Sequence, residues 1–156
     1  VLKDNYASSF ANIGVLFGSL GIFTGMIWAR STWGAFWTND PKLNGAAIGM
    51  LIYIAYIILR ASVEDEMMRG KLAATYNIFA FVIYIAFIFV IPRLTDSLHP
   101  GNGGNPAFSS YDLDNTLRIF FYPATLGWIA LSLWVSSILI RFNTIKQVLE
   151  DSYEEI

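Results

Sequence analysis

The chain has 156 residues, of which 55% are hydrophobic and only 14% are charged, whereas a soluble domain carries roughly a quarter of charged residues. Its net charge of −2 is too small to favour a nucleic-acid partner. It contains no cysteine, which excludes disulfides, zinc–thiolate sites and iron–sulfur clusters.

The charges are distributed so that four long windows of the sequence carry none. Each window has roughly the 17 to 25 residues that a helix needs to cross hydrocarbon. A helix satisfies the hydrogen bonds of all its own backbone groups in lipid. Four segments are too few to close into a β-barrel, which is the other way to satisfy them. We therefore predict an all-α polytopic membrane helical bundle, a single membrane domain over residues 1–156 with four transmembrane helices at about 7–29, 43–60, 72–92 and 119–141.

The first expected span contains four glycines that are four, three and four residues apart. At about 3.6 residues per turn they share one face of a helix. Such a face lets another helix approach closely, so we expect it to contact protein rather than lipid. The residues are Gly14, Gly18, Gly21 and Gly25.

An aromatic loop, expected at residues 30–42, follows this span and reads RSTWGAFWTNDPK. Its end, Asn39 and Asp40 before Pro41, predicts a turn followed by a helix start. The tryptophans alone are typical of an aromatic belt at the membrane surface. The cations Arg30 and Lys42 likewise suit span ends.

No Asp, Glu, Lys, Arg or His lies inside any of the four expected spans, and Arg60 and Arg141 stand only at the ends of the second and fourth. Proton relays and ion-coupled carriers need such groups at membrane depth. This pattern disfavours a small-molecule carrier. It also disfavours an anchor that holds haem between histidines inside the membrane.

The second loop on the same side is expected at residues 93–118 and contains His99, the only histidine of the chain. Asp112 or Asp114 is expected to cap the last span, and Pro123 to kink or open its first turns. The segment after residue 140 continues at helical period.

Basic residues are slightly more numerous on the side that carries both termini. The positive-inside rule then places the termini in the cytoplasm and the two loops outside it. The two sets are Lys3, Arg60, Arg69, Lys71, Arg141 and Lys146 on the terminal side, and Arg30, Lys42, Arg93 and Arg118 on the loop side.

Three kinds of side chain therefore share the loop face: aromatic rings, cations and one imidazole. A flat apolar ligand with anionic edges and a metal centre would use all three, and haem fits that description. We expect haem b, bound non-covalently and transiently, with Trp28 among the aromatic contacts. Its propionates would pair with Arg30, Lys42 and Arg93.

The sequence of the loop resembles the WGxxWxWDxR/K signature, or WWD motif, of haem-handling membrane proteins. The matching residues are Trp33, Gly34, Trp37, Asp40 and Lys42. Two spans later, PRLTDSLHPG resembles the loop in which those proteins place a haem-ligating histidine. Order, separation and size resemble the CcmC family of bacterial cytochrome c maturation. Asn39 stands where that family has its third tryptophan, and could hydrogen-bond a propionate or hold the turn.

The resemblance implies a function and a set of partners. Trp33, Trp37 and Asp40 would contact haem or a periplasmic haem chaperone (CcmE-like), and His99 would be an axial ligand. The chaperone would receive haem for cytochrome c assembly, helped by ATP-driven transporter subunits (CcmA/CcmB-like) and a small single-span subunit (CcmD-like). The setting would be the bacterial inner membrane. That family has six spans, so this chain would begin at the third, with the second axial ligand upstream of Val1.

One other interpretation stays open. A structural packing subunit of a membrane transporter, or of another membrane complex, would explain the glycine face and the tryptophans without any ligand. An enzyme is not expected, because the sequence offers no nucleophile–base pair, carboxylate pair or metal triad.

Overall fold

The computed structural model describes residues 2–99 and 114–154, and every regular element in these ranges is helical. The elements are α1 (Leu2–Trp33), α2 (Pro41–Ala61), α3 (Glu66–Ile85), the π-helical segment η1 (Ala86–Val90), α4 (Ile91–Leu94) and α5 (Asn115–Glu154).

Within residues 2–99 and 114–154, four helical stretches are long and apolar enough to cross a membrane, namely Asp4–Trp33, Pro41–Ala61, Glu66–Leu94 and Asn115–Glu150. This confirms the all-α membrane fold, and we describe the chain as a multi-pass membrane protein. The helices extend beyond the expected spans. In particular, α1 continues through the first residues of the expected 30–42 loop and ends only at Trp33.

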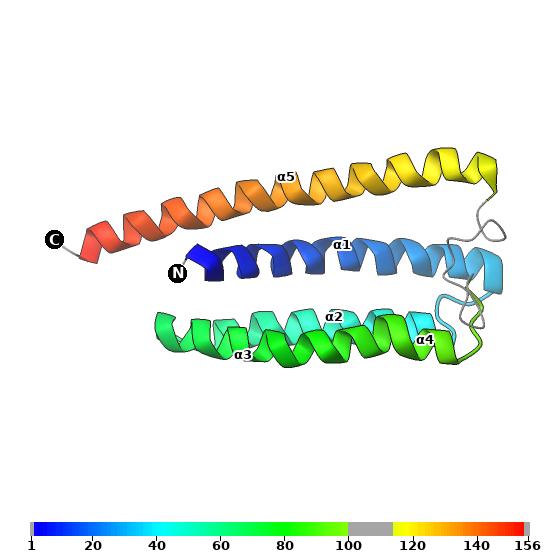
Figure 1. The fold of residues 1–156 in the computed structure, drawn as a ribbon, viewed down its shortest axis with the longest axis horizontal. Helices are drawn as coiled ribbons and strands as arrows, with labels where there is room; N and C mark the ends of the chain where they lie inside the picture. The colour runs from blue at the N-terminus through cyan, green and yellow to red at the C-terminus, as the bar shows by residue number, and fades with distance from the viewer. Residues whose placement is uncertain (1, 100–113, 155–156) are drawn as a thin grey trace.

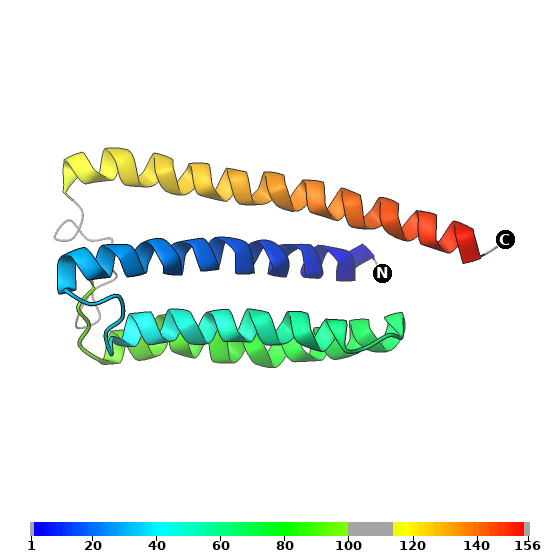
Figure 2. The same ribbon diagram turned by 180° about the vertical axis from the view of Figure 1, so that it is seen from behind.

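The helix α1 lies at the centre of the bundle, with α5 on one side and the α2–α3 pair on the other (Figure 1). The view from behind shows the same order (Figure 2). Both termini lie at one end, and the turns that follow α1 and α4 meet at the other (Figure 1). We call these the terminal end and the loop end.

Local chemistry explains where α1 ends and α2 begins. Gly34 follows α1 with a φ of 80°, a left-handed conformation that glycine adopts without strain. Asp40 is the N-cap of α2 and Pro41 is its first residue, as the Asn-Asp-Pro sequence predicts. Asp114 caps α5 by accepting from the backbone N of Leu117 at 2.6 Å.

Glycines set the distance between neighbouring helices at several points. A Cβ on Gly14 would lie 3.1 Å from Tyr53 of α2, and one on Gly18 would overlap Met50. These two glycines allow α1 and α2 to pack closely, as expected. Gly21 and Gly25 have nothing within 4 Å of such a Cβ. The outer half of the glycine face therefore borders open space instead of a helix.

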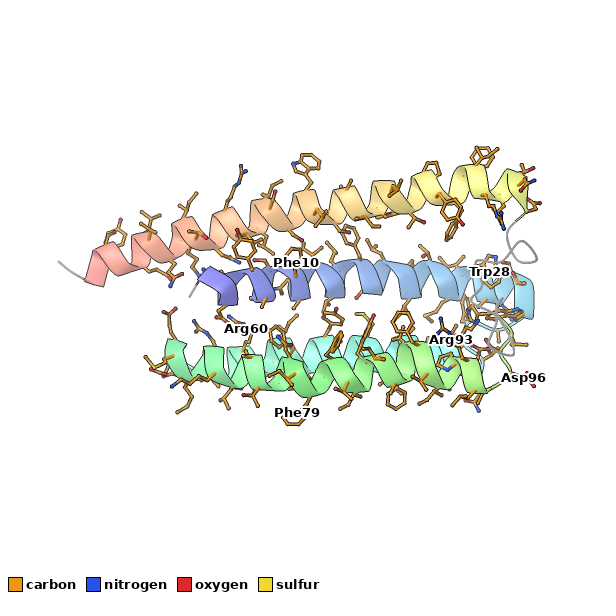
Figure 3. All side chains as sticks on the ribbon, viewed as in Figure 1. Phe10, Trp28, Arg60, Phe79, Arg93 and Asp96 are labelled. Atoms are coloured by element: carbon orange, nitrogen blue, oxygen red, sulfur yellow. The ribbon has the colours of Figure 1, made fainter. Side chains whose placement is uncertain are left out.

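Polar side chains add specific contacts between the helices. Towards the terminal end, Asn143 of α5 donates to Ser9 of α1 at 3.2 Å. At that end, Asp4 of α1 also forms an ion pair with Arg60 of α2. Figure 3 shows Arg60 near this end, whereas Trp28 and Arg93 are both towards the loop end. The predicted meeting of two separated segments at one end is thus present.

The segment between α3 and α4 departs from regular helix. The backbone N of Ile91 donates to the carbonyl of Ala86, five residues earlier, which is the π pattern. Pro92 follows at once and has no N–H for the carbonyl of Ile88. The carbonyl of Phe87, inside η1, approaches Gly45 of α2 so closely that a Cβ there would lie 2.5 Å away.

Candidate functional site

The carboxylate of Asp40 is the centre of the loop end. It is buried, with 1% of its side chain exposed. Its Oδ1 accepts from the backbone N of Lys42 at 2.9 Å and of Leu43 at 3.2 Å, which caps α2. Its Oδ2 accepts from Ser97 Oγ at 2.8 Å and from the backbone N of Leu98 at 2.6 Å. One side chain thus joins the start of α2 to the segment after α4.

His99 completes this cluster. Its Nδ1 lies 3.0 Å from Asp40 Oδ1, and 27% of its side chain is exposed. The backbone N of His99 also donates to Ser97 Oγ at 3.1 Å. Within the part of the chain that the structure describes, no hydrogen bond involves Nε2 of His99.

Two indoles flank the imidazole. The ring of Trp33 meets that of His99 edge to face, with centroids 4.6 Å apart. Trp28 lies 5.0 Å from Trp33 at 79°, and 6.4 Å from His99. The indoles are therefore roughly perpendicular and do not form one flat platform. They restrict the imidazole from the side of α1.

A cavity of about 400 Å³ adjoins His99. The glycine face of α1 forms one wall, and the first turns of α2 form another. Its lining residues are Gly18, Gly21, Ile22, Gly25, Met26, Trp37, Lys42, Leu43, Ala46 and His99. The open space beside Gly21 and Gly25 is thus part of this cavity, and Trp37 and His99 both border it.

The remaining predicted site residues have varied surroundings. Arg30 donates to the carbonyl of Gly34 and lies over the Phe36 ring at 5.8 Å. Asn39 accepts from Asn44 at 2.8 Å, so its amide holds the turn in this structure. Arg93 is exposed and forms no ion pair among residues 2–99 and 114–154. Most of the expected 93–118 loop lies outside the described residues.

The environment of Asp40 favours its ionised form. Burial on its own would raise the pKa of this carboxyl. The hydrogen bonds from Ser97, Leu98, Leu43 and His99 together outweigh burial and hold its pKa below the usual 3.8. An ionised carboxylate can only accept, so it favours a proton on Nδ1 of His99.

Sequence reasoning missed two residues of this cluster. Ser97 connects Asp40 to the backbone of His99, and Asn44 accepts from Trp37 Nε1 at 3.3 Å while donating to Asn39. The signal for Ser97 was its place two residues before the histidine, where a serine hydroxyl often accepts from a following backbone N–H.

Nε2 of His99 is a candidate metal-ligating nitrogen that lies beside the cavity. Among residues 2–99 and 114–154 no three His, Cys, Asp or Glu side chains gather as ligands for a bare ion. The imidazole of His99, whose Nε2 has no hydrogen-bond partner among the described residues, lies next to the cavity and two indoles and could hold the iron of a haem.

Fold and site together define a class: a multi-pass helical membrane protein with a histidine–carboxylate–tryptophan cluster at one end of its bundle. The sequence model of a family described as cytochrome c assembly protein matches residues 2–99. The chain belongs to this cytochrome c assembly protein family. The match covers α1 to His99 and so includes every residue of the cluster.

Similar proteins carry the name cytochrome c biogenesis protein CcsA. One from Heterosigma akashiwo is 34% identical over 88 residues, which are 56% of this chain and 26% of that protein. One from Prochlorococcus marinus subsp. pastoris is 40% identical over 78 residues, 50% of this chain and 24% of the relative. One from Ranunculus macranthus is 31% identical over 96 residues, 62% and 29% of the two chains.

These matched segments are only about a quarter of each relative's length. No solved structure matches the chain. The resemblance to the WWD motif led us to expect a family of haem-handling proteins for cytochrome c maturation. Membership of the cytochrome c assembly protein family is confirmed. The narrower resemblance to CcmC is not confirmed, because the matched relatives named here are CcsA proteins.

Proposed function

We propose that this protein binds haem at its loop end and passes it on for cytochrome c assembly. The observation that carries the proposal is the place of His99: Asp40 and Trp33 hold it beside a cavity, and its Nε2 has no hydrogen-bond partner among the described residues. Membership of the cytochrome c assembly family supports it, since cytochrome c needs haem.

The residues of the site would divide the work. Nε2 of His99 would be an axial ligand of the iron. Trp37 and the glycine face would line the space beside it, and Trp33 would hold the imidazole. Lys42 at the cavity, with Arg30 and Arg93 at the same end, would pair with propionates. Any covalent chemistry would belong to haem and its recipient.

The recipient is the finer part of the proposal. From the resemblance to CcmC we infer a periplasmic haem chaperone, with ATP-driven transporter subunits and a small single-span subunit as companions in a bacterial inner membrane. The relatives' name, cytochrome c biogenesis protein, favours a second candidate, delivery to the apocytochrome itself. Photocrosslinkers at exposed Asp96 would discriminate the two, by yielding adducts with the chaperone or with apocytochrome c.

Haem titration of the purified protein tests the binding step. Removal of a residue that only supports a metal ligand weakens metal binding roughly 10- to 100-fold. His99→Ala removes the ligand itself, so it should weaken haem binding by more than this. Trp33→Ala should weaken it too, because the imidazole loses its edge contact. Trp134→Ala is the matched control, as Trp134 is an exposed residue of α5.

The measurement is the absorption spectrum of bound haem and its dissociation constant. A packing subunit without a ligand would respond to none of these substitutions. Equal haem binding by the wild type, His99→Ala and Trp33→Ala would therefore remove the proposal in favour of that alternative.

A further inference from the structure

We propose that Asp40 is a positioning residue: it fixes the tautomer and orientation of His99, so that Nε2 is the ring nitrogen left for iron. This proposal rests on the proposed function, and it identifies Asp40 as the residue that orients the iron-ligating side chain of His99. It also differs from the expectation that Asp40 contacts haem or a partner directly.

The hydrogen-bonding capacity of the Asp40 carboxylate is fully used within the protein. Asp40 accepts from two backbone N–H groups of α2, from Ser97 Oγ, from the backbone N of Leu98 and from His99. A carboxylate has about four lone-pair sites, so none remains for an outside donor. With 1% of its side chain exposed, Asp40 could reach a porphyrin only by giving up these contacts.

The contacts of the His99 imidazole determine which of its nitrogens carries the proton. The carboxylate can only accept, so a neutral His99 carries its proton on Nδ1 and its lone pair on Nε2. The edge-to-face contact with Trp33, whose ring centroid lies 4.6 Å from that of His99, opposes rotation of the imidazole. A carboxylate partner also raises the basicity of a metal-ligating histidine. Tautomer, direction and donor strength are thus set before any ligand arrives.

Capping of α2 alone does not require an aspartate at residue 40. Asparagine caps helices about as well as aspartate. Asp65, the N-cap of α3, serves that purpose with one bond, to the backbone N of Met68 at 2.6 Å. At residue 40 an amide would place N–H groups against the donors Ser97, Leu98 or His99. The ionised form of Asp40 is therefore required by its contacts with Ser97, Leu98 and His99 and not by the cap of α2.

The matched pair of variants is Asp40→Asn and Asp65→Asn, the same change at two N-caps. The chain contains one histidine, so isotope labelling of histidine gives a single imidazole in nitrogen NMR. In haem-free protein at mildly alkaline pH, we expect the wild type and Asp65→Asn to carry the proton on Nδ1. Asp40→Asn should show a mixture or the Nε2-protonated form. Protonation of the wild type at Nε2, or an unchanged spectrum in Asp40→Asn, overturns the proposal.

Haem titration separates this proposal from the proposed function. We expect Asp40→Asn to lower affinity by about 10- to 100-fold and to raise the reduction potential of bound haem, since a less basic imidazole stabilises ferric iron less. Asp65→Asn should change neither. If Asp40→Asn bound haem like the wild type while His99→Ala did not, the positioning role would be wrong and the proposed function would stand. If His99→Ala also bound normally, haem ligation itself would be wrong.

Should Asp40→Asn not fold, Ser97→Ala replaces it. This variant keeps the carboxylate and the helix cap but removes the hydroxyl that joins Asp40 to the backbone of His99. Because the carboxylate remains, the proton should stay on Nδ1 of His99. The haem affinity should still fall, by less than in Asp40→Asn, because the segment that carries His99 is held less firmly. A proton on Nε2, or an unchanged haem affinity, would overturn the proposal.

Discussion

At the scale of single residues, the site depends on contacts between segments that are far apart in the chain. Asp40 and His99 are separated by 59 residues, and Asp40 and Ser97 by 57. The Asn-Asp-Pro sequence predicts the cap, because capping is a local interaction. It could not predict the bond to His99, which depends on how α2 and α4 pack.

Gly45 shows the same dependence on packing, and it gives a stability prediction. Gly45→Ala should gain up to about 1 kcal/mol of helix propensity. Its Cβ would lie 2.5 Å from the carbonyl oxygen of Phe87, so α2 and η1 must separate. Overpacking costs about 1–3 kcal/mol, so we expect a net loss of stability.

Gly127→Ala is the control for this substitution, because a Cβ there has nothing within 4 Å. It should leave the stability unchanged or raise it slightly. The measurement is the unfolding midpoint in mixed micelles, followed by tryptophan fluorescence. Equal midpoints for the two variants would contradict the close approach of Gly45 to Phe87.

At the scale of helices, hydropathy predicts that four spans exist, but their ends and irregularities depend on other forces. The π-helical turn at Ala86–Val90 has no periodic signature in a segment that is apolar all round. Pro92 was a local signal for disturbed hydrogen bonding. Pro123 carries the same signal, yet α5 runs through it as one helix. The glycine face predicted close packing, which the structure contains at Gly14 and Gly18 but not at Gly21 or Gly25.

The contact of α5 with α1 gives a prediction at this scale. Asn143 donates to Ser9, across 134 residues of sequence. In a double-mutant cycle of Ser9→Ala and Asn143→Ala, we expect a coupling free energy of about 0.6 kcal/mol, typical of side-chain hydrogen bonds between membrane helices.

The control cycle pairs Asn143→Ala with Asn12→Ala. Asn12 donates to the carbonyl of Ser8 within its own helix, so the two changes should be additive. Both cycles use the free energy of unfolding in mixed micelles. A coupling equal to that of the control would mean that α5 docks on α1 without this hydrogen bond.

At the scale of the whole molecule, the helical bundle brings the two halves of the site to one end and leaves both termini at the other (Figure 1). Two of the spans in the described residues, Pro41–Ala61 and Glu66–Leu94, lie between the turn after α1 and the segment after α4, so both must emerge on one side. This is why sequence alone could place the tryptophans and His99 on one face. Which compartment that face meets follows from the positive-inside rule, and it remains a prediction.

The absence of cysteine makes the orientation directly measurable, because any introduced thiol is the only one in the chain. Thr32→Cys and Asp96→Cys place thiols at exposed positions of the loop end, and Ser62→Cys places one at the exposed turn after α2 at the other end. With intact bacterial cells and a membrane-impermeant maleimide, we expect the first two to react and Ser62→Cys to react only after lysis.

Reaction of Thr32→Cys and Asp96→Cys from opposite sides would mean that the indoles and the imidazole cannot share one haem. Reaction of Ser62→Cys alone in intact cells would keep the site but reverse its orientation, because the bias of basic residues would then not govern insertion.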